Sequence, residues 1–344
     1  MNGTDSSSWW CAEMLSPREI GLLTVPCAFG VVSGFNDGGN LLASFTAGRV
    51  IPPRAAWALL LLSVLGPLIV GAQVARTVGL SVIDLAGQGA VGFVFIAAAA
   101  VGVVLGSWRL RIPTSMTLAL VGAMIGWTLA DEHRSSIHWH GVARVLVGMP
   151  VSVVVGLICA FVSYRGVRRL LSRVPHARVL RLARYQYVTS ALQAVAYGSN
   201  DMEKTIGLVV VAEVLAGTSR VPRFDSWMPL TLAFVSFSLG ALIGGWRVAR
   251  RVGSGVFRVR PMQAMSEQFG AGIVVAALAF AGVPVSSTQT IDGSLIGVGV
   301  GVRASGVRWS AVREMLATWL VTFPLALLSA LLLHLVLRAT TGIG

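Results

Sequence analysis

The side chains best suited to bind a charged ligand lie in two short polar segments inside otherwise apolar stretches. These segments read "GFNDGGN" (34–40) and "GSNDMEK" (198–204), so both follow the pattern G-x-N-D-x-x-[NK]. A carboxylate in such a stretch is costly unless an ion, a proton or a basic side chain compensates its charge. Lys204, the only lysine of the chain, is one such partner.

A second pair of motifs also recurs in the same order. "PTSMT" (113–117) is repeated as "PVSST" (284–288), and each copy leads into a run of small and apolar residues. Proline near a helix start, with serine or threonine as N-cap, is typical of a helix N-terminus. The backbone N–H groups and hydroxyls at such an end favour an anion. The two motif pairs together predict that cations and an oxyanion bind side by side.

Both motifs also have purely structural explanations. Asp37 and Asp201 serve equally well as helix caps, and hydroxyl groups commonly join helices within membranes. The recurrence of two different motifs in both halves favours a binding site at the interface between the halves.

The composition indicates a membrane protein. Of 344 residues, 55% are hydrophobic and 12% are charged, and the mean hydropathy is +0.77, whereas soluble domains are about one quarter charged. The chain has room for about ten spans of ~20 residues. The net charge of +13 is assigned to membrane topology, and no nucleic-acid partner is expected, because the arginines lie mostly between apolar runs. The expected spans are 18–48, 53–75, 88–107, 112–130, 141–164, 185–218, 226–246, 262–282, 283–302 and 309–338.

Arginine-rich segments set the expected orientation. The segment 165–184 has seven arginines and 246–260 has five, and neither has an acidic residue, so both should be cytoplasmic. An odd number of crossings in each half then places both termini outside and inverts one half relative to the other. The expected divisions are an extracellular stub at 1–17, repeat 1 at 18–164, a basic cytoplasmic linker at 165–184, repeat 2 at 185–338 and a tail at 339–344.

The predicted fold is an all-α polytopic membrane protein. It has two inverted-topology repeats, whose broken helices and helical hairpins meet at a substrate site near the membrane midplane. We expect the helix to break at each Gly-x-Asn-Asp, because such breaks are tolerated at this depth where they line a buried or wet cavity.

These motifs resemble the inorganic phosphate transporter (PiT) family. That family has a duplicated Gly-Ala-Asn-Asp element followed by Asn or Lys, and a duplicated Pro-x-Ser-Thr-Thr-His element. The segment 297–326 is similar to the region after the second hairpin of the family. The resemblance implies a secondary transporter in a bacterial cell membrane that imports inorganic phosphate with Na⁺ or H⁺ by alternating access. It implies a homodimer among membrane lipids, and no cofactor besides the co-transported ion.

The resemblance also implies roles for individual residues. The expected coupling-cation residues, which include a possible Na⁺ site at the two Asn-Asp pairs, are Asn36, Asp37, Asn200 and Asp201. The expected phosphate-binding residues are Asn40, Ser115, Thr117, Lys204, Ser286, Ser287 and Thr288.

The sequence departs from the family pattern at several of these motifs. Leu118 and Gln289 stand where histidine is usual, and Glu203 stands where glutamine is common. Glu203 adds a titratable group beside Asp201, which suggests that it carries a coupling proton. Lys204 has the opposite electrostatic effect on a neighbouring carboxyl group, so the sequence leaves open which of the two sets the coupling ion.

Two other functions are compatible with these motifs. One is a permease for sulfate or another tetrahedral oxyanion. The other, less favoured, is a membrane-embedded enzyme acting on lipid phosphates with Asp201 or Ser286 as nucleophile. It is disfavoured because no histidine partner lies nearby in sequence.

Overall fold

The computed structural model describes residues 16–109, 114–131, 134–245 and 259–341. These residues are almost entirely helical, and the β-pairing within them is one isolated bridge between Ile83 and Ile137. The elements of the first half are α1 (Pro17–Ser33), η1 (Gly34–Gly38), α2 (Gly39–Ala47), α3 (Pro53–Leu61), η2 (Leu62–Val64), α4 (Leu65–Val70), α5 (Gln73–Arg76), η3 (Thr77–Ser81), α6 (Gly89–Arg109), α7 (Met116–Ala130), η4 (Arg134–Ser136) and α8 (Trp139–Leu171).

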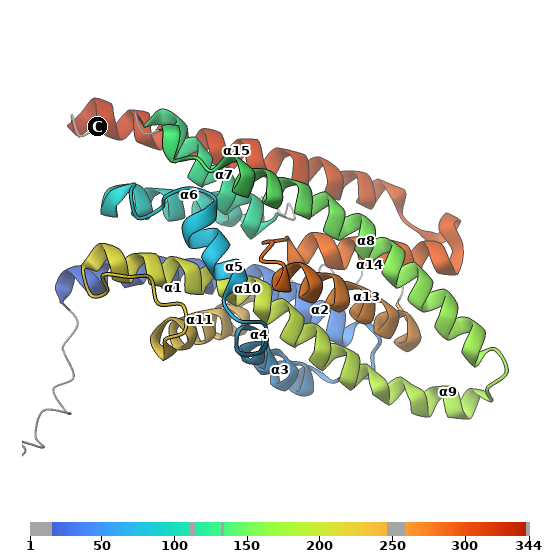
Figure 1. The fold of residues 1–344 in the computed structure, drawn as a ribbon. Coiled ribbons are helices and arrows are strands. Elements are labelled where there is room, and N and C mark those ends of the chain that lie inside the picture. Colours follow the sequence, from blue (N-terminus) through green and yellow to red (C-terminus); the bar gives the residue numbers. More distant parts are fainter. Residues whose placement is uncertain (1–15, 110–113, 132–133, 246–258, 342–344) are drawn as a thin grey trace, which may run out of the picture.

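The second half has fewer described elements, but its long helices follow one another in a similar order (Figure 1). Its elements are α9 (His176–Leu182), η5 (Ala183–Tyr185), α10 (Gln186–Ala216), α11 (Trp227–Gly240), η6 (Ala241–Gly245), α13 (Pro261–Phe280), α14 (Ser287–Arg303), η7 (Ala304–Gly306) and α15 (Trp309–Thr341). The arginine-rich segment 165–184, predicted as a linker, continues α8 by two turns and then forms α9 and η5.

Six helical segments are long and apolar enough to cross a membrane, rather than the ten predicted. They are Pro17–Ala47, Pro53–Val70, Gly89–Arg109, Trp139–Leu171, Trp227–Gly245 and Trp309–Thr341. The predicted spans 112–130 and 283–302 become α7 and α14, with 15 and 17 residues. At 1.5 Å per residue these helices are about 22 and 26 Å long, shorter than a ~30 Å hydrocarbon core.

The two short helices belong to the predicted helical hairpins. α7 packs against α6, and α14 packs against α13. A hairpin that enters and leaves on the same side adds no net crossing of the membrane, and neither does a pair of full spans. The odd number of crossings expected for each half stays a prediction, because the six segments divide into four in the first half and two in the second.

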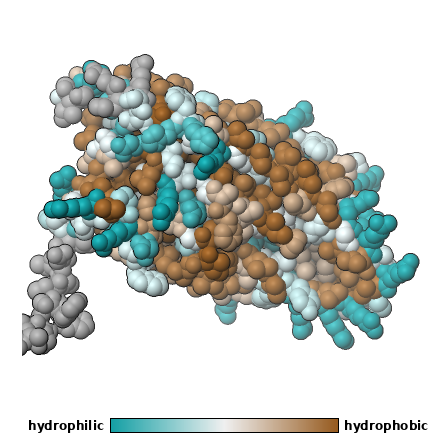
Figure 2. Space-filling view, in the orientation of Figure 1, coloured by the Kyte–Doolittle hydropathy of each residue, from teal (hydrophilic) through white to brown (hydrophobic). Residues whose placement is uncertain are grey.

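The surface matches a membrane environment. Figure 2 shows a broad apolar area over the body of the molecule with hydrophilic side chains gathered toward its ends. Large exposed apolar side chains include Ile69, Val147 and Leu320. Every arginine whose side chain is described is exposed, whereas Lys204 is only 1% exposed. The single lysine therefore differs in environment from all of the described arginines.

Helices of each half pack on helices of the other half. α1 packs on α11 and α10 on α4, while α8 packs on α14 and α15 on α7. Matching glycines make these crossings close. A Cβ atom on Gly34 would collide with the carbonyl of Phe237, and one on Gly198 would collide with the carbonyl of Ser63.

This close packing explains why the chain does not leave the helix at either Gly-x-Asn-Asp motif, in contrast to the predicted interruption. The first copy is a π-helical segment, η1, between α1 and α2, and the second copy is regular α-helix within α10. The motif glycines bring two helices together instead of breaking one.

Candidate functional site

The tips of the two hairpins form equivalent helix starts. Ser115 caps α7, because its Oγ accepts a hydrogen bond from the Leu118 N–H at 3.2 Å. Ser286 caps α14 through the Gln289 N–H at 3.4 Å. The N-cap geometry predicted for the Pro-x-Ser motifs is thus present. It also shows that these two hydroxyls serve their own helices.

The second Asn-Asp copy lies against the α14 tip. The Asp201 Oδ1 atom accepts hydrogen bonds from Asn200 Nδ2, Lys204 Nζ and Ser287 Oγ, each at 2.9 Å. The Asp201 Oδ2 atom is buried and has no hydrogen-bond partner among the described residues. Asp201 therefore combines a saturated oxygen with one available for a further ligand.

The carbonyl oxygen of Val285 joins this cluster to both hairpins. It accepts hydrogen bonds from Asn200 Nδ2 at 2.9 Å, Lys204 Nζ at 3.0 Å and Thr117 Oγ1 at 2.9 Å. The Val285 N–H in turn donates to Asn200 Oδ1 at 3.0 Å. The amide of Asn200 therefore pairs with the backbone of Val285 in both directions, as a neighbouring strand would.

The first Asn-Asp copy reaches across to the same tip. Asp37 accepts hydrogen bonds from Asn36 Nδ2 at 2.8 Å, Ser33 Oγ at 3.1 Å and Thr288 Oγ1 at 3.1 Å. Asn40 Nδ2 donates to Thr288 Oγ1 at 2.6 Å. Thr288 thus links the side chain of Asn40 to the carboxylate of Asp37.

The first copy also touches its own hairpin. Asn36 Nδ2 lies 3.4 Å from the carbonyl oxygen of Thr114, at the α7 tip. Both Asn-Asp pairs and both hairpin tips therefore meet in one place, as the sequence predicts. The predicted residues brought together there are Asn36, Asp37, Asn40, Thr117, Asn200, Asp201, Lys204, Ser287 and Thr288.

Glu203 lies outside this cluster although it is two residues from Asp201. Its Oε2 atom accepts the backbone N–H groups of Val74 at 2.8 Å and Ala75 at 3.2 Å. These donors belong to the first turn of α5, where a carboxylate is favourably placed. Glu203 is fully buried, so it fixes the chain between α4 and α5 against α10.

A third polar cluster was not predicted from the sequence. Glu267 of α13 accepts hydrogen bonds from Ser44 Oγ at 2.6 Å and Gln193 Nε2 at 3.2 Å. Gln268 Nε2 donates to the Ser44 carbonyl at 3.0 Å. The sequence signal was weak, because the three helices involved lie far apart in the chain and show no shared motif.

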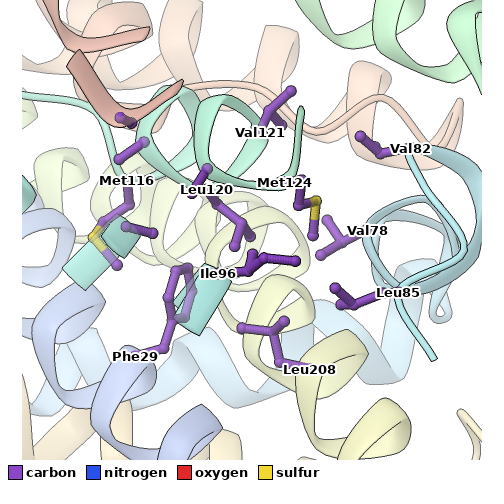
Figure 3. Packing of buried hydrophobic residues seen from close by; sticks show 14 of the residues in the cluster. Phe29, Val78, Val82, Leu85, Ile96, Met116, Leu120, Val121, Met124 and Leu208 are labelled. Carbon is purple, nitrogen blue, oxygen red and sulfur yellow. The ribbon is translucent and has the colours of Figure 1, made fainter. Parts of the chain in front are cut away.

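The residues that correspond to this third cluster in the opposite half are apolar. With the spacing of the motifs, Ser44, Gln193 and Glu267 correspond to Leu208, Phe29 and Ile96. These three are buried together in the largest apolar cluster (Figure 3), which also includes Leu120 and Met124. Equivalent places on the two sides of the site are thus polar in one case and apolar in the other.

The charge of the buried side chains is unbalanced. Seven described carboxylates are buried, whereas Lys204 is the one buried Lys or Arg among the side chains that the structure describes. The buried carboxylates are Glu19, Asp37, Asp201, Glu203, Glu213, Glu267 and Asp292. Buried charges require compensation, so this interior is suited to bind cations or protons.

The site also offers groups that suit an anion. The first N–H groups of α7 and α14 have no acceptor within their own helices and carry partial positive charge. The hydroxyls of Thr117, Ser287 and Thr288 lie in the first turns of these helices. A buried site with these donors, inside a bundle with six membrane-length helices, is that of a multi-pass membrane transporter for a charged solute.

Comparison with known proteins defines the family. Residues 33–330 match the model of the phosphate transporter family, and the chain belongs to this family. A probable low-affinity inorganic phosphate transporter of Rhizobium meliloti is 32% identical over 93% of this chain and 97% of its own length. Its counterpart in Mycobacterium bovis is 34% identical over 87% of this chain and 72% of its own length.

A solved structure shows the same fold. It is described as the sodium-dependent phosphate transporter and superposes with a TM-score of 0.82, over 94% of this chain and 100% of the other, at 19% identity. The family and these relatives are transporters, so the chain is a transporter and not an enzyme acting on lipid phosphates.

Proposed function

We propose that this protein imports inorganic phosphate across a bacterial cell membrane by symport with H⁺ or Na⁺. The observation that carries the proposal is the meeting of two Asn-Asp pairs with two hairpin tips. Carboxylates for cations and helix N-termini for an anion then lie within one buried site. A cation bound beside the anion reduces the electrostatic cost of holding either in the membrane.

Individual residues divide between the two ligands. Asp37 and Asp201, oriented by Asn36 and Asn200, supply the negative charge that a bound cation or Lys204 balances. The α7 and α14 N-termini hold the anion, and Thr117, Ser287 and Thr288 position these tips through their hydroxyl hydrogen bonds. Ser115 and Ser286 contribute by capping those helices, while Asn40 orients Thr288.

Phosphate is favoured over sulfate by one feature of the site. The unpartnered, buried Asp201 Oδ2 is an acceptor, and phosphate at neutral pH still carries a proton that it can donate. Sulfate has no proton to donate and would meet this oxygen with electrostatic repulsion. This oxygen therefore discriminates between two tetrahedral anions of similar size.

The exchanged packing of the halves supports an alternating-access mechanism. Two repeats of inverted orientation, with cytoplasmic 165–184 and extracellular termini, expose the site to either side when one set of elements rocks against the other. We propose further that the protein is a homodimer.

The test is uptake of radiolabelled phosphate into proteoliposomes under imposed Na⁺ or H⁺ gradients. We expect concentrative uptake under at least one gradient, with excess sulfate competing weakly. The proposal is abandoned if neither gradient drives uptake. Equal competition by sulfate would instead make the protein a general oxyanion permease.

A further inference from the structure

We propose that Lys204 is a built-in substitute for one of two coupling cations, so that this transporter moves one mobile cation fewer per phosphate than its two carboxylate sites would otherwise require. The inference rests on the proposed function and specifies its stoichiometry. It follows from a comparison of the two copies of the site, which share one frame and differ in one charge.

The shared frame joins a carboxylate to a backbone carbonyl. In the first copy, Asn36 Nδ2 lies 2.8 Å from Asp37 Oδ1 and 3.4 Å from the Thr114 carbonyl oxygen. In the second copy, Asn200 Nδ2 lies 2.9 Å from both Asp201 Oδ1 and the Val285 carbonyl oxygen. The motif spacing makes Thr114 and Val285 equivalent positions, so each copy presents the same pair of oxygens.

Only the second copy contains a positive charge between these oxygens. Lys204 Nζ lies 2.9 Å from Asp201 Oδ1 and 3.0 Å from the Val285 carbonyl oxygen. A carboxylate oxygen and a carbonyl oxygen are also what a bound metal cation selects. The Lys204 ammonium therefore occupies the position at which these two oxygens would coordinate a metal cation.

The first copy has a neutral amide at the equivalent place. Asn40 stands where Lys204 stands in the second motif, and its Nδ2 donates to Thr288 Oγ1. Asp37 accepts hydrogen bonds from neutral donors. Among the described residues it forms no ion pair with a Lys or Arg. Since a buried carboxylate without a counter-charge is costly, the mobile cation binds at Asp37.

Lys204 has an alternative role as a direct ligand of phosphate. Its ammonium has three N–H donors, and two of them are used by Asp201 and Val285. The two roles predict opposite results when the charge is removed. A substituted cation site still binds phosphate once a mobile cation fills it, whereas a lost phosphate ligand is not restored by any cation.

The experiment is a charge count in Lys204→Asn, which copies the first motif. Proteoliposomes are loaded with phosphate, and the membrane potential at which net phosphate flux is zero gives the charge moved per phosphate. We expect one additional positive charge per phosphate in Lys204→Asn at the same pH. Asn40→Lys, the reciprocal change, should remove one. Glu203→Gln should leave the charge moved per phosphate unchanged, because the carboxylate of Glu203 contacts α5.

A binding measurement covers the case of a variant that does not turn over. The slope of log phosphate affinity against log cation activity counts the cations bound with phosphate, and it should increase by one in purified Lys204→Asn. An unchanged charge and slope would overturn the inference. So would complete loss of phosphate binding at every cation concentration in a variant that remains folded. Failure of the wild-type protein to take up phosphate would refute the proposed function instead.

Discussion

At the scale of single residues, the two aspartates of the site differ in what balances their charge. Asp201 is paired with Lys204, whereas Asp37 accepts hydrogen bonds from neutral groups. Removing either carboxylate should abolish uptake, but the consequences for folding should differ. A buried ammonium left without its partner is costly, whereas a neutral amide in a network of neutral groups is not.

We therefore expect Asp201→Asn to lower the free energy of unfolding by about 3–5 kcal/mol, and Asp37→Asn to change it by about 1 kcal/mol or less. Thermal unfolding of purified protein in detergent, without phosphate, measures both. The double variant Asp201→Asn, Lys204→Met should recover much of the stability lost in Asp201→Asn. Equal destabilisation by the two single variants would contradict the assigned pairing.

Glu203 provides a test that separates positioning from coupling. Its Oε2 accepts two backbone N–H groups of α5, and the carbonyl oxygen of glutamine can accept them as well. Glu203→Gln should therefore retain stability within about 1 kcal/mol and keep uptake driven by a pH gradient. Glu203→Leu leaves the N–H groups of Val74 and Ala75 unsatisfied, so it should lose both stability and uptake. Loss of proton-driven uptake in a stable Glu203→Gln variant would support the original expectation that Glu203 carries the proton.

Residues that share a local motif were predictable, and those joined only in three dimensions were not. The Asn-Asp and Pro-x-Ser motifs are duplicated within the chain, and the structure brings them together. The contact of Glu203 with Val74, more than a hundred residues away, has no local signature. The same holds for the cluster of Ser44, Gln193 and Glu267, which is assembled from three helices.

At the scale of elements, the helix crossings depend on glycines whose role was predicted differently. Sequence reasoning treats glycine beside Asn-Asp as a helix breaker, because it lacks side-chain support. In the structure, Gly198 lies against the Ser63 carbonyl, and Gly66 lies against Val195 and Ser199. The helix hydrogen bonds are retained because the neighbouring helix fills the space that a side chain would otherwise occupy.

Gly198→Ala should therefore disrupt the contact of α10 with η2, although alanine has the higher helix propensity. We expect a destabilisation of about 1–3 kcal/mol, as for overpacking elsewhere, together with reduced uptake. Gly21→Ala is the matched control, because a Cβ atom there has no atom within 4 Å. Thermal unfolding and phosphate uptake of both variants test the crossing. Similar behaviour of the two would show that Gly198 is not a packing glycine.

The overall element order was predictable from hydropathy, but the number of spans was not. Hydropathy alone does not distinguish a full crossing from one arm of a hairpin, since α7 is as apolar as the spanning segments and differs from them mainly in length. The lengths depend on where Ser115 and Ser286 begin the helices. A hydropathy window of ~20 residues is too long to recognise a helix of 15 residues, such as α7, that starts at a buried site.

At the scale of the whole molecule, the proposed orientation can be tested at the two ends of α10. Arg184 and Thr218 lie just beyond its first and last residues, and both are exposed. In a cysteine-free background, Arg184→Cys should react with a membrane-impermeant maleimide only from the cytoplasmic side. Thr218→Cys should react only from outside. Labelling of both from the same side would exclude α10 as a spanning helix, and the reverse pattern would invert the proposed topology.

The unequal surroundings of the site have a consequence for how water reaches it. Parting the surfaces around Ser44, Gln193 and Glu267 exposes groups that water solvates well. Parting the equivalent surfaces around Leu208, Phe29 and Ile96 wets apolar area at about 25 cal/mol per Å². Without phosphate, we therefore expect the protein to rest hydrated at the Glu267 end and dry at the Phe29 end. Ser44→Cys should then react with a small aqueous thiol reagent faster than Leu208→Cys does. A faster reaction at Leu208→Cys would mean that the dry side is the one that opens first.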